Sequence, residues 1–299
     1  MSFSPNILMD LQDIFQYPFM QHAFEAGTIV AIIAGVIGYF VVLRRSSFAA
    51  HALSHIGFAG AAGAIVLSVS PVFGLLLFTI IGGIAMVGLG VRGNKMDVQI
   101  GVVLAFMLGL GLLFISLYRG GSTVSLTISI LFGQVLGVSS YDVTLTLIAG
   151  LIILAAISII YRPLLFASLD EDVAEARGVP LLLLGMIFII LVAVTTSIAV
   201  QVVGVLLIFS LTVTPAAIGQ QLAKRPWKAM MIAVSVALFA TWIGLFLAFY
   251  EPYPVSFFIT TIVFGIYILV RFAYPRIASI RSRPSLKTQD AIMTDSLRN

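Results

Sequence analysis

Long apolar stretches separated by short polar breaks dominate the chain. Several breaks carry turn-forming residues, as at Ser70-Pro71 and Gly120-Gly121-Ser122. A helix needs about 20 mostly apolar residues to cross a bilayer. The stretches of roughly that length are 20–43, 48–68, 71–90, 98–118, 141–161, 180–198, 200–221, 229–250 and 254–272. A further apolar stretch, 123–138, is short for a span, and we expect it to be re-entrant or interfacial. The pattern predicts an all-α, polytopic membrane protein with eight or nine transmembrane helices.

Composition supports this interpretation. Of the 299 residues, 61% are hydrophobic and only 9% are charged, whereas a soluble domain carries about 25% charged residues. The absence of cysteine excludes disulfides and thiolate metal sites. Residues 1–17 contain two aspartates and no basic residue, which does not fit a cleavable signal peptide. We expect 1–17 to lie outside, 18–275 to form the transmembrane domain, and 276–299 to be a flexible cytoplasmic tail.

The distribution of Lys and Arg predicts the orientation. With nine spans and an outside N-terminus, all of the 16 basic residues except Arg119 fall on one side. The positive-inside rule assigns that side to the cytoplasm. The basic pI of about 9.5 is therefore explained by topology, and no nucleic-acid partner is expected. The parity of the first segment would change if 48–68 were re-entrant.

Two of the three histidines, His51 and His55, lie one helical turn apart in an apolar segment. Counted from Arg45, His55 lies roughly 15 Å into a hydrocarbon core of about 30 Å. Imidazoles at that depth are costly and usually functional, and neutral imidazole suits zinc and related metals. The alternatives are a proton relay or interhelical hydrogen bonds. His22 is alone near the other surface and is interpreted as a polar boundary residue.

The segment SLDEDVAEARGVP, residues 168–180, carries the signals of a short capped helix between two spans. Ser168 and Glu171 fit a capping box, and Gly178 followed by Pro180 fits a helix stop. A charged, rigid element on the cytoplasmic side is a plausible docking site for a soluble partner, although a surface linker is the simpler alternative. The residues assigned to it are Leu169, Asp170, Glu171, Asp172, Val173, Ala174, Glu175, Ala176, Arg177 and Gly178.

A proline lies inside the apolar stretch 202–225. Pro215 removes a backbone donor and is expected to kink the helix. Thr212 and Thr214 are then candidates to satisfy the freed carbonyl groups. The helix is interpreted either as a kinked packing element or as a hinged helix that lines a transport pathway.

Several classes of function are disfavoured by what the sequence lacks. No GxxxxGK[ST] phosphate loop occurs, so the chain does not bind ATP by that route. No HExxH motif and no serine–histidine–acid set is present, which argues against an enzyme. A proton-coupled carrier usually needs a carboxylate within the membrane. Glu25 and Asp142 lie near predicted span ends, so the sequence disfavours this class of carrier.

Three stretches, in order, resemble the permease subunit of bacterial ABC transporters for zinc, manganese or iron. They are FVVLRRSSFAAHALSHIGFAGAAGA, ILFGQVLGVS and VVGVLLIFSLTVTPAAIGQQLAKR. The resemblance covers about residues 18–272. It implies a type II importer-like fold, a homodimer in the bacterial inner membrane, and a cytoplasmic coupling helix at about 168–179. It also implies an extracytoplasmic metal-binding protein and two separate ATP-binding subunits, with no permanently bound cofactor.

The same resemblance implies functional residues. The family has an aspartate at the position of His51, paired with the histidine at His55, and these positions hold the ion during passage. An imidazole pair is softer and favours zinc over manganese. Gln134 replaces another usual aspartate and is assigned to the pathway with Thr212, Thr214 and Pro215. The open alternatives are an iron-chelate or vitamin permease of related architecture, a standalone secondary carrier or channel, and an intramembrane metalloenzyme.

Overall fold

The computed structural model of the protein describes residues 15–90, 96–118, 130–133, 135–251 and 253–281. This part of the chain is helical, without strands. Its helices are α2 (Pro18–Leu43), α3 (Ser47–Val66), α4 (Pro71–Gly90), α5 (Met96–Leu117), the 3₁₀ turn η1 (Val135–Gly137), α7 (Ser140–Leu169), α8 (Glu171–Ala176), α9 (Leu181–Val203), α10 (Val205–Leu222), α11 (Pro226–Tyr250) and α12 (Val255–Arg281).

Nine helices in the described residues are long and apolar enough to cross a membrane, which confirms the all-α, polytopic prediction. Each corresponds to one predicted stretch. Two helices run well past their predicted ends: α12 continues to Arg281, so residues 276–281 of the predicted flexible tail are helical, and α7 continues to Leu169, beyond the predicted end at residue 161. Leu164 and Ala167 are fully buried there, so packing continues the helix through Pro163. The short stretch 123–138 forms no long helix in its described part, residues 130–133 and 135–138.

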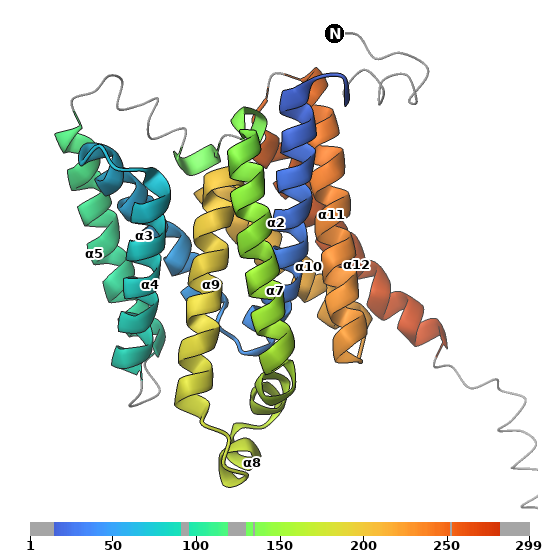
Figure 1. Ribbon diagram of the computed structural model, residues 1–299. Coiled ribbons are helices and arrows are strands. Elements are labelled where there is room, and N and C mark those ends of the chain that lie inside the picture. The colour runs from blue at the N-terminus through green and yellow to red at the C-terminus, as the bar shows by residue number, and fades with distance from the viewer. Residues whose placement is uncertain (1–14, 91–95, 119–129, 134, 252, 282–299) are drawn as a thin grey trace, which may run out of the picture.

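The helices form two groups that run roughly parallel to one axis (Figure 1). In the first group, α2 packs against α7, α9, α10 and α11, and α12 packs on α10 and α11. In the second, α3 packs on α4 and α5. The groups meet where α3 contacts α9 and α10 and α4 contacts α9. Helix α8 lies at one end of the molecule, called here the α8 end, and the start of α2 lies at the opposite end.

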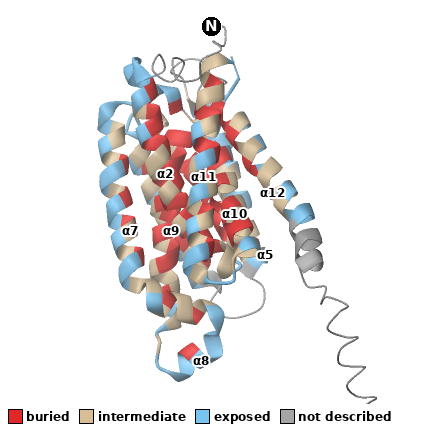
Figure 2. Ribbon diagram, turned by 90° about the vertical axis from the view of Figure 1, so that its right-hand side faces the viewer, coloured by how far each residue is buried: buried red, intermediate tan, exposed pale blue. Residues whose placement is uncertain are grey.

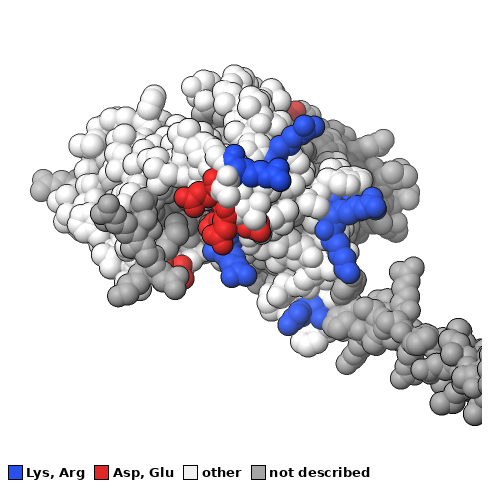
Figure 3. All heavy atoms as spheres, turned by 90° about the horizontal axis from the view of Figure 1, so that it is seen from below, with Lys and Arg blue, Asp and Glu red and all other residues white. Residues whose placement is uncertain are grey.

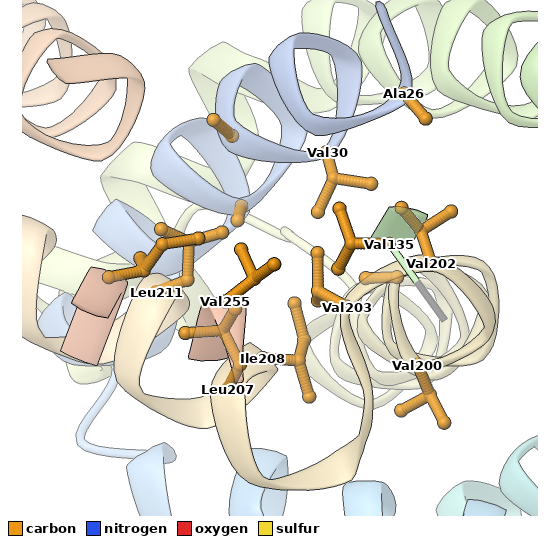
Figure 4. Close-up of a cluster of buried hydrophobic side chains, with 14 of the residues drawn as sticks. Ala26, Val30, Val135, Val200, Val202, Val203, Leu207, Ile208, Leu211 and Val255 are labelled. Carbon is orange, nitrogen blue, oxygen red and sulfur yellow. The ribbon is translucent and has the colours of Figure 1, made fainter. Parts of the chain in front are cut away.

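Burial distinguishes the inner helices from the outer ones. In Figure 2, α2, α9 and α10 carry long runs of buried residues, while α7 shows mostly exposed and intermediate ones. Figure 4 shows one buried cluster, to which Val30 of α2, Val203 of α9 and Ile208 of α10 contribute. Large apolar side chains stay exposed on outer helices, such as Phe106 on α5, which is 66% exposed. Hydrocarbon tails can cover such side chains without the cost that water would impose.

Small residues allow two close helix crossings. A Cβ at Gly38 of α2 would collide with the carbonyl oxygen of Thr212 on α10. Gly60 of α3 and Gly74 of α4 each approach the other's carbonyl oxygen in the same way. Close approach of this kind is the usual mode of packing in membrane helices. It fixes α10 against α2 and α4 against α3, the two helix pairs beside the candidate site.

The short helix α8 begins later than its sequence predicts. Asp170 is the N-cap residue, and its carboxylate accepts a hydrogen bond of 3.0 Å from the Val173 amide. Ser168 still belongs to α7, where its hydroxyl donates to the carbonyl of Leu164 at 2.5 Å. The predicted Ser168–Glu171 capping box is therefore wrong, because the preceding span uses Ser168. The stop is as predicted, with Gly178 at a φ of +78°.

Candidate functional site

The two histidines of α3 contact each other directly. The ring centroids of His51 and His55 are 4.7 Å apart, and the rings meet edge to face at 80°. Both side chains are partly buried. Nδ1 of His51 is inaccessible to solvent and has no hydrogen-bond partner in the described part of the chain. A buried polar nitrogen without a partner costs free energy, which makes His51 a candidate functional residue.

Helix α10 supplies the neighbour of this pair. The ring of Phe209 lies 4.7 Å from the His51 ring, centroid to centroid, at an interplanar angle of 64°. The partly exposed positions of α10 in this stretch are Phe209, Ser210, Val213 and Thr214, which spread over about 140° of the helix surface. Phe209 lies at one edge of this arc and borders the histidines.

The residues predicted for the pathway separate into different environments. Thr212 is buried, and its hydroxyl donates to the carbonyl of Ile208 at 2.7 Å, so it is satisfied within α10. Pro215 is also buried, whereas Thr214 is partly exposed. Of the three described residues, only Thr214 is therefore partly exposed. Gln134 lies outside the described residues.

The turn before α3 is tied to the α8 end by Arg44. Its guanidinium carbon lies 5.5 Å from the ring centroid of Phe188 on α9. Burial lowers the pKa of Arg44, and the Glu171 carboxylate of α8 acts in the opposite direction. Both residues line a cavity of about 240 Å³ between α8, α9 and the turn. Within the described chain, Nη1 of Arg44 has no hydrogen-bond partner.

Helix α8 projects from this end and is mostly exposed. Of its six residues, only Ala174 is buried. Leu169, the last residue of α7, and Val173 of α8 are exposed apolar side chains, at 64% and 43%. Figure 3, which looks onto the α8 end, shows a patch of acidic residues with basic residues around it. The acidic residues of this segment are Asp170, Glu171, Asp172 and Glu175.

The sequence profile of the ABC 3 transport family matches residues 16–274. The chain belongs to the ABC 3 transport family. The resemblance found in the sequence is therefore confirmed over nearly the whole transmembrane region. The family assignment also makes α8 and the α3 histidines comparable with corresponding elements of other family members.

Relatives of this ABC 3 family member include named transport proteins. The manganese transport system membrane protein MntC of Listeria innocua is 30% identical over 246 residues, which cover 81% of this chain and 86% of that protein. The manganese import system permease protein ScaB of Streptococcus parasanguinis is 29% identical over 237 residues, covering 78% and 83%. Among solved structures, PsaBC from Streptococcus pneumoniae in complex with Fab matches with a TM-score of 0.80 and 26% identity, covering 89% of this chain and 96% of that chain.

Two contacts at the site were not evident from the sequence of this ABC 3 protein. Phe209 belongs to an apolar run, and nothing in that run indicates that its ring meets His51. Arg44 was counted only as a charge at a span boundary, whereas its guanidinium is held against Phe188. Each contact joins helices far apart in the chain, so neither has a local sequence signal.

Proposed function

We propose that this chain is the permease subunit of an ATP-driven importer for a divalent transition metal, zinc or manganese. The observation that carries the proposal is the His51–His55 contact within a membrane-spanning helix of an ABC 3 family member. The chain itself would hydrolyse no ATP. Separate cytoplasmic ATPase subunits would drive alternating access, and an extracytoplasmic binding protein would deliver the metal.

The histidine pair is an incomplete metal site in a single chain. Within the described residues, no group of three or more His, Cys, Asp or Glu side chains is placed to hold a metal ion. A homodimer would bring two pairs together across a shared pathway. Four imidazole nitrogens would then match the tetrahedral coordination that Zn²⁺ prefers.

The choice between zinc and manganese follows from the ligands. Imidazole binds zinc well, whereas manganese is better matched to carboxylate, carbonyl and water oxygens. The imidazole pair therefore favours zinc in this chain, and the manganese names of the MntC and ScaB relatives support the second metal. A competition experiment between the two metals decides between them.

Coupling would run through the α8 end. Its described basic residues support a cytoplasmic orientation under the positive-inside rule. The exposed side chains of Leu169 and Val173 and the acidic residues of α8 offer a docking surface for the ATPase subunit. Glu171 and Arg44 share a cavity, and Arg44 lies in the turn that leads into α3. A displacement of α8 would thus be passed through Arg44 to α3, which carries the histidines. The proline at position 215 would let α10 bend in response.

The test is uptake of radiolabelled zinc and manganese, in competition, by cells that make the protein with its native partners. The double variant His51→Ala/His55→Ala should lose metal uptake while its amount in the membrane stays unchanged. His22→Ala is the matched control, because His22 lies near the opposite end of the molecule, and it should transport normally. Undiminished uptake by the double variant would refute the metal site, whereas no zinc or manganese uptake by the unaltered protein would favour a chelate or vitamin permease.

A second arm tests the energy source. The chain expressed without its ATPase subunits should not transport zinc or manganese. Transport by the chain alone would instead identify a secondary carrier. Binding of the purified ATPase subunit to membranes should remain in the double histidine variant, because α8 is unchanged in it.

A further inference from the structure

A cavity with a few polar residues in its lining lies at the end of the molecule opposite α8. It encloses about 550 Å³ between the α3–α4 turn, the segment near residues 137–142 and the last turn of α9. Its polar lining consists of Ser70, Tyr141, Asp142 and Gln201, while apolar side chains such as Leu75 form the remaining wall. No Lys or Arg is among the described residues that line it.

Asp142 is the only acidic residue of this lining, and both of its oxygens are held in fixed positions. Oδ2 accepts hydrogen bonds from the amide and the hydroxyl of Ser139, at 3.1 and 2.7 Å, and thereby caps α7. Oδ1 accepts a bond of 2.8 Å from Nε2 of Gln201 on α9. Capping of α7 uses only Oδ2 of Asp142. The hydrogen bond between Oδ1 and Gln201 is therefore not required for the cap.

The Gln201 amide adds a second oxygen ligand beside the carboxylate. Because its nitrogen must face the Asp142 oxygen to donate, its carbonyl oxygen is left for another partner. No positive side chain of the described lining neutralises Asp142. Carboxylate, amide and hydroxyl oxygens form a hard ligand set, which suits a divalent cation that keeps part of its water shell.

The cavity also adjoins the helix that carries the histidine pair. Ala61 of α3 lines it, and Ala61 lies six residues beyond His55, about 9 Å along the helix axis. We infer that this cavity is a staging site, where a hydrated divalent metal ion is held by Asp142 and Gln201 before it reaches His51 and His55. The inference rests on the proposed function for the direction of movement, but metal binding in the cavity is measurable on its own.

One experiment measures that binding directly. The full-length protein carrying His51→Ala/His55→Ala is purified in detergent and titrated with Mn²⁺, whose free ion is followed by electron paramagnetic resonance. This parent variant should retain a weak Mn²⁺ site. Adding Asp142→Asn should weaken binding by at least about tenfold, because even partners of metal ligands affect affinity on that order. Adding Gln201→Glu should tighten it, since a second carboxylate joins the site.

Two controls separate a cation site from a helix cap and from general surface charge. Ser139→Ala removes the cap hydroxyl but keeps the carboxylate, so it should lower thermal stability and weaken Mn²⁺ binding less than Asp142→Asn does. Glu251→Gln removes an exposed carboxylate at the end of α11, outside the cavity lining, and should leave Mn²⁺ affinity unchanged. The inference is overturned if the parent binds no Mn²⁺, if Asp142→Asn binds like the parent, or if either control weakens binding equally.

The outcome is distinguishable from that of the proposed function. Loss of zinc and manganese uptake in the His51→Ala/His55→Ala variant tests the transport proposal without reference to Asp142. A chain that transports metal but shows no Asp142-dependent binding would refute only the staging site. A chain that binds Mn²⁺ through Asp142 but transports no metal would refute only the transport proposal.

Discussion

The rings of His51 and Phe209 pack edge to face at 4.7 Å between centroids and join α3 to α10. Nδ1 of His51 has no hydrogen-bond partner in the described residues, so no hydrogen bond at this atom orients the ring. The contact with Phe209 is then a determinant of the ring orientation. The position of the histidine pair should therefore depend on α10 as well as on α3.

Replacing Phe209 should impair transport without removing either histidine. Aromatic pairs contribute about 0.5–1.5 kcal/mol beyond burial, so we expect Phe209→Ala to reduce zinc uptake by about twofold to tenfold. Phe209→Tyr keeps the ring and should retain most of the uptake. The control is Phe264→Ala, because Phe264 is 59% exposed on α12. Equal losses in the Phe209 and Phe264 variants would show that His51 does not depend on this contact.

The identity of the residue at position 51 should set metal preference. His51→Asp replaces one imidazole with a carboxylate, which is harder and negatively charged. We expect the ratio of manganese to zinc uptake to rise by roughly tenfold, following the ligand preferences of the two metals. Uptake of each labelled metal in the presence of the other measures this ratio. His22→Asp adds the same charge away from the pair, and a comparable shift in that variant would contradict the assignment.

The spans could be predicted because uninterrupted apolar length alone identifies a membrane helix. The extension of α7 to Leu169 could not, since Arg162 and Pro163 have the local signals of a boundary. Burial of Leu164 and Ala167 overrides these signals. The N-cap of α8 is not predictable for a related reason, because Ser168 and Asp170, two residues apart, both suit a cap, and Asp170 is the one that caps α8 in the structure.

The candidate site could be predicted only in part from the sequence. His51 and His55 face the same side because they are four residues apart in one helix, and the structure has them in contact. The hydrogen bond between Asp142 and Gln201 joins residues 59 positions apart. In helices that are apolar on all sides, the hydrophobic period does not fix which faces meet, so such pairings require the three-dimensional structure.

Arg44 should be needed to couple ATP hydrolysis to transport. Its guanidinium packs on Phe188 and faces Glu171 of α8 across their shared cavity. We expect Arg44→Gln to reduce metal uptake while ATP hydrolysis by the assembled complex continues. Arg44→Lys should be intermediate, because it keeps the charge but loses the planar group that stacks on an aromatic ring. Both activities are measured in vesicles that contain the complex.

A matched variant tests whether this effect is specific to Arg44. Arg225→Gln removes another basic residue at the α8 end, at the start of α11, and should leave uptake and hydrolysis coupled. If Arg44→Gln lowers uptake and hydrolysis in parallel, Arg44 serves assembly and not coupling. If both activities stay at the wild-type level, the Arg44–Glu171 connection has no role in transport.

A buried hydroxyl pair should stabilise the junction between the two helix groups. Oγ1 of Thr79 on α4 lies 2.6 Å from Oγ of Ser197 on α9, and both residues are fully buried. Each hydroxyl has one proton, so one donates across the helices while the other donates to its own helix. A double-mutant cycle with Thr79→Val and Ser197→Ala should give a coupling free energy of about 0.6 kcal/mol, and at most about 1.7 kcal/mol.

The cycle is measured as the free energy of unfolding of the full-length protein in mixed micelles with a denaturing detergent. Thr144→Val is the control, because the hydroxyl of Thr144 is exposed and donates only to the Ser140 carbonyl of its own helix. That variant should change stability little and show no coupling to Ser197. Additive effects of Thr79→Val and Ser197→Ala would mean that each hydroxyl is satisfied within its own helix, by the carbonyls of Leu75 and Ala193. The α4–α9 junction would then be held by apolar packing alone.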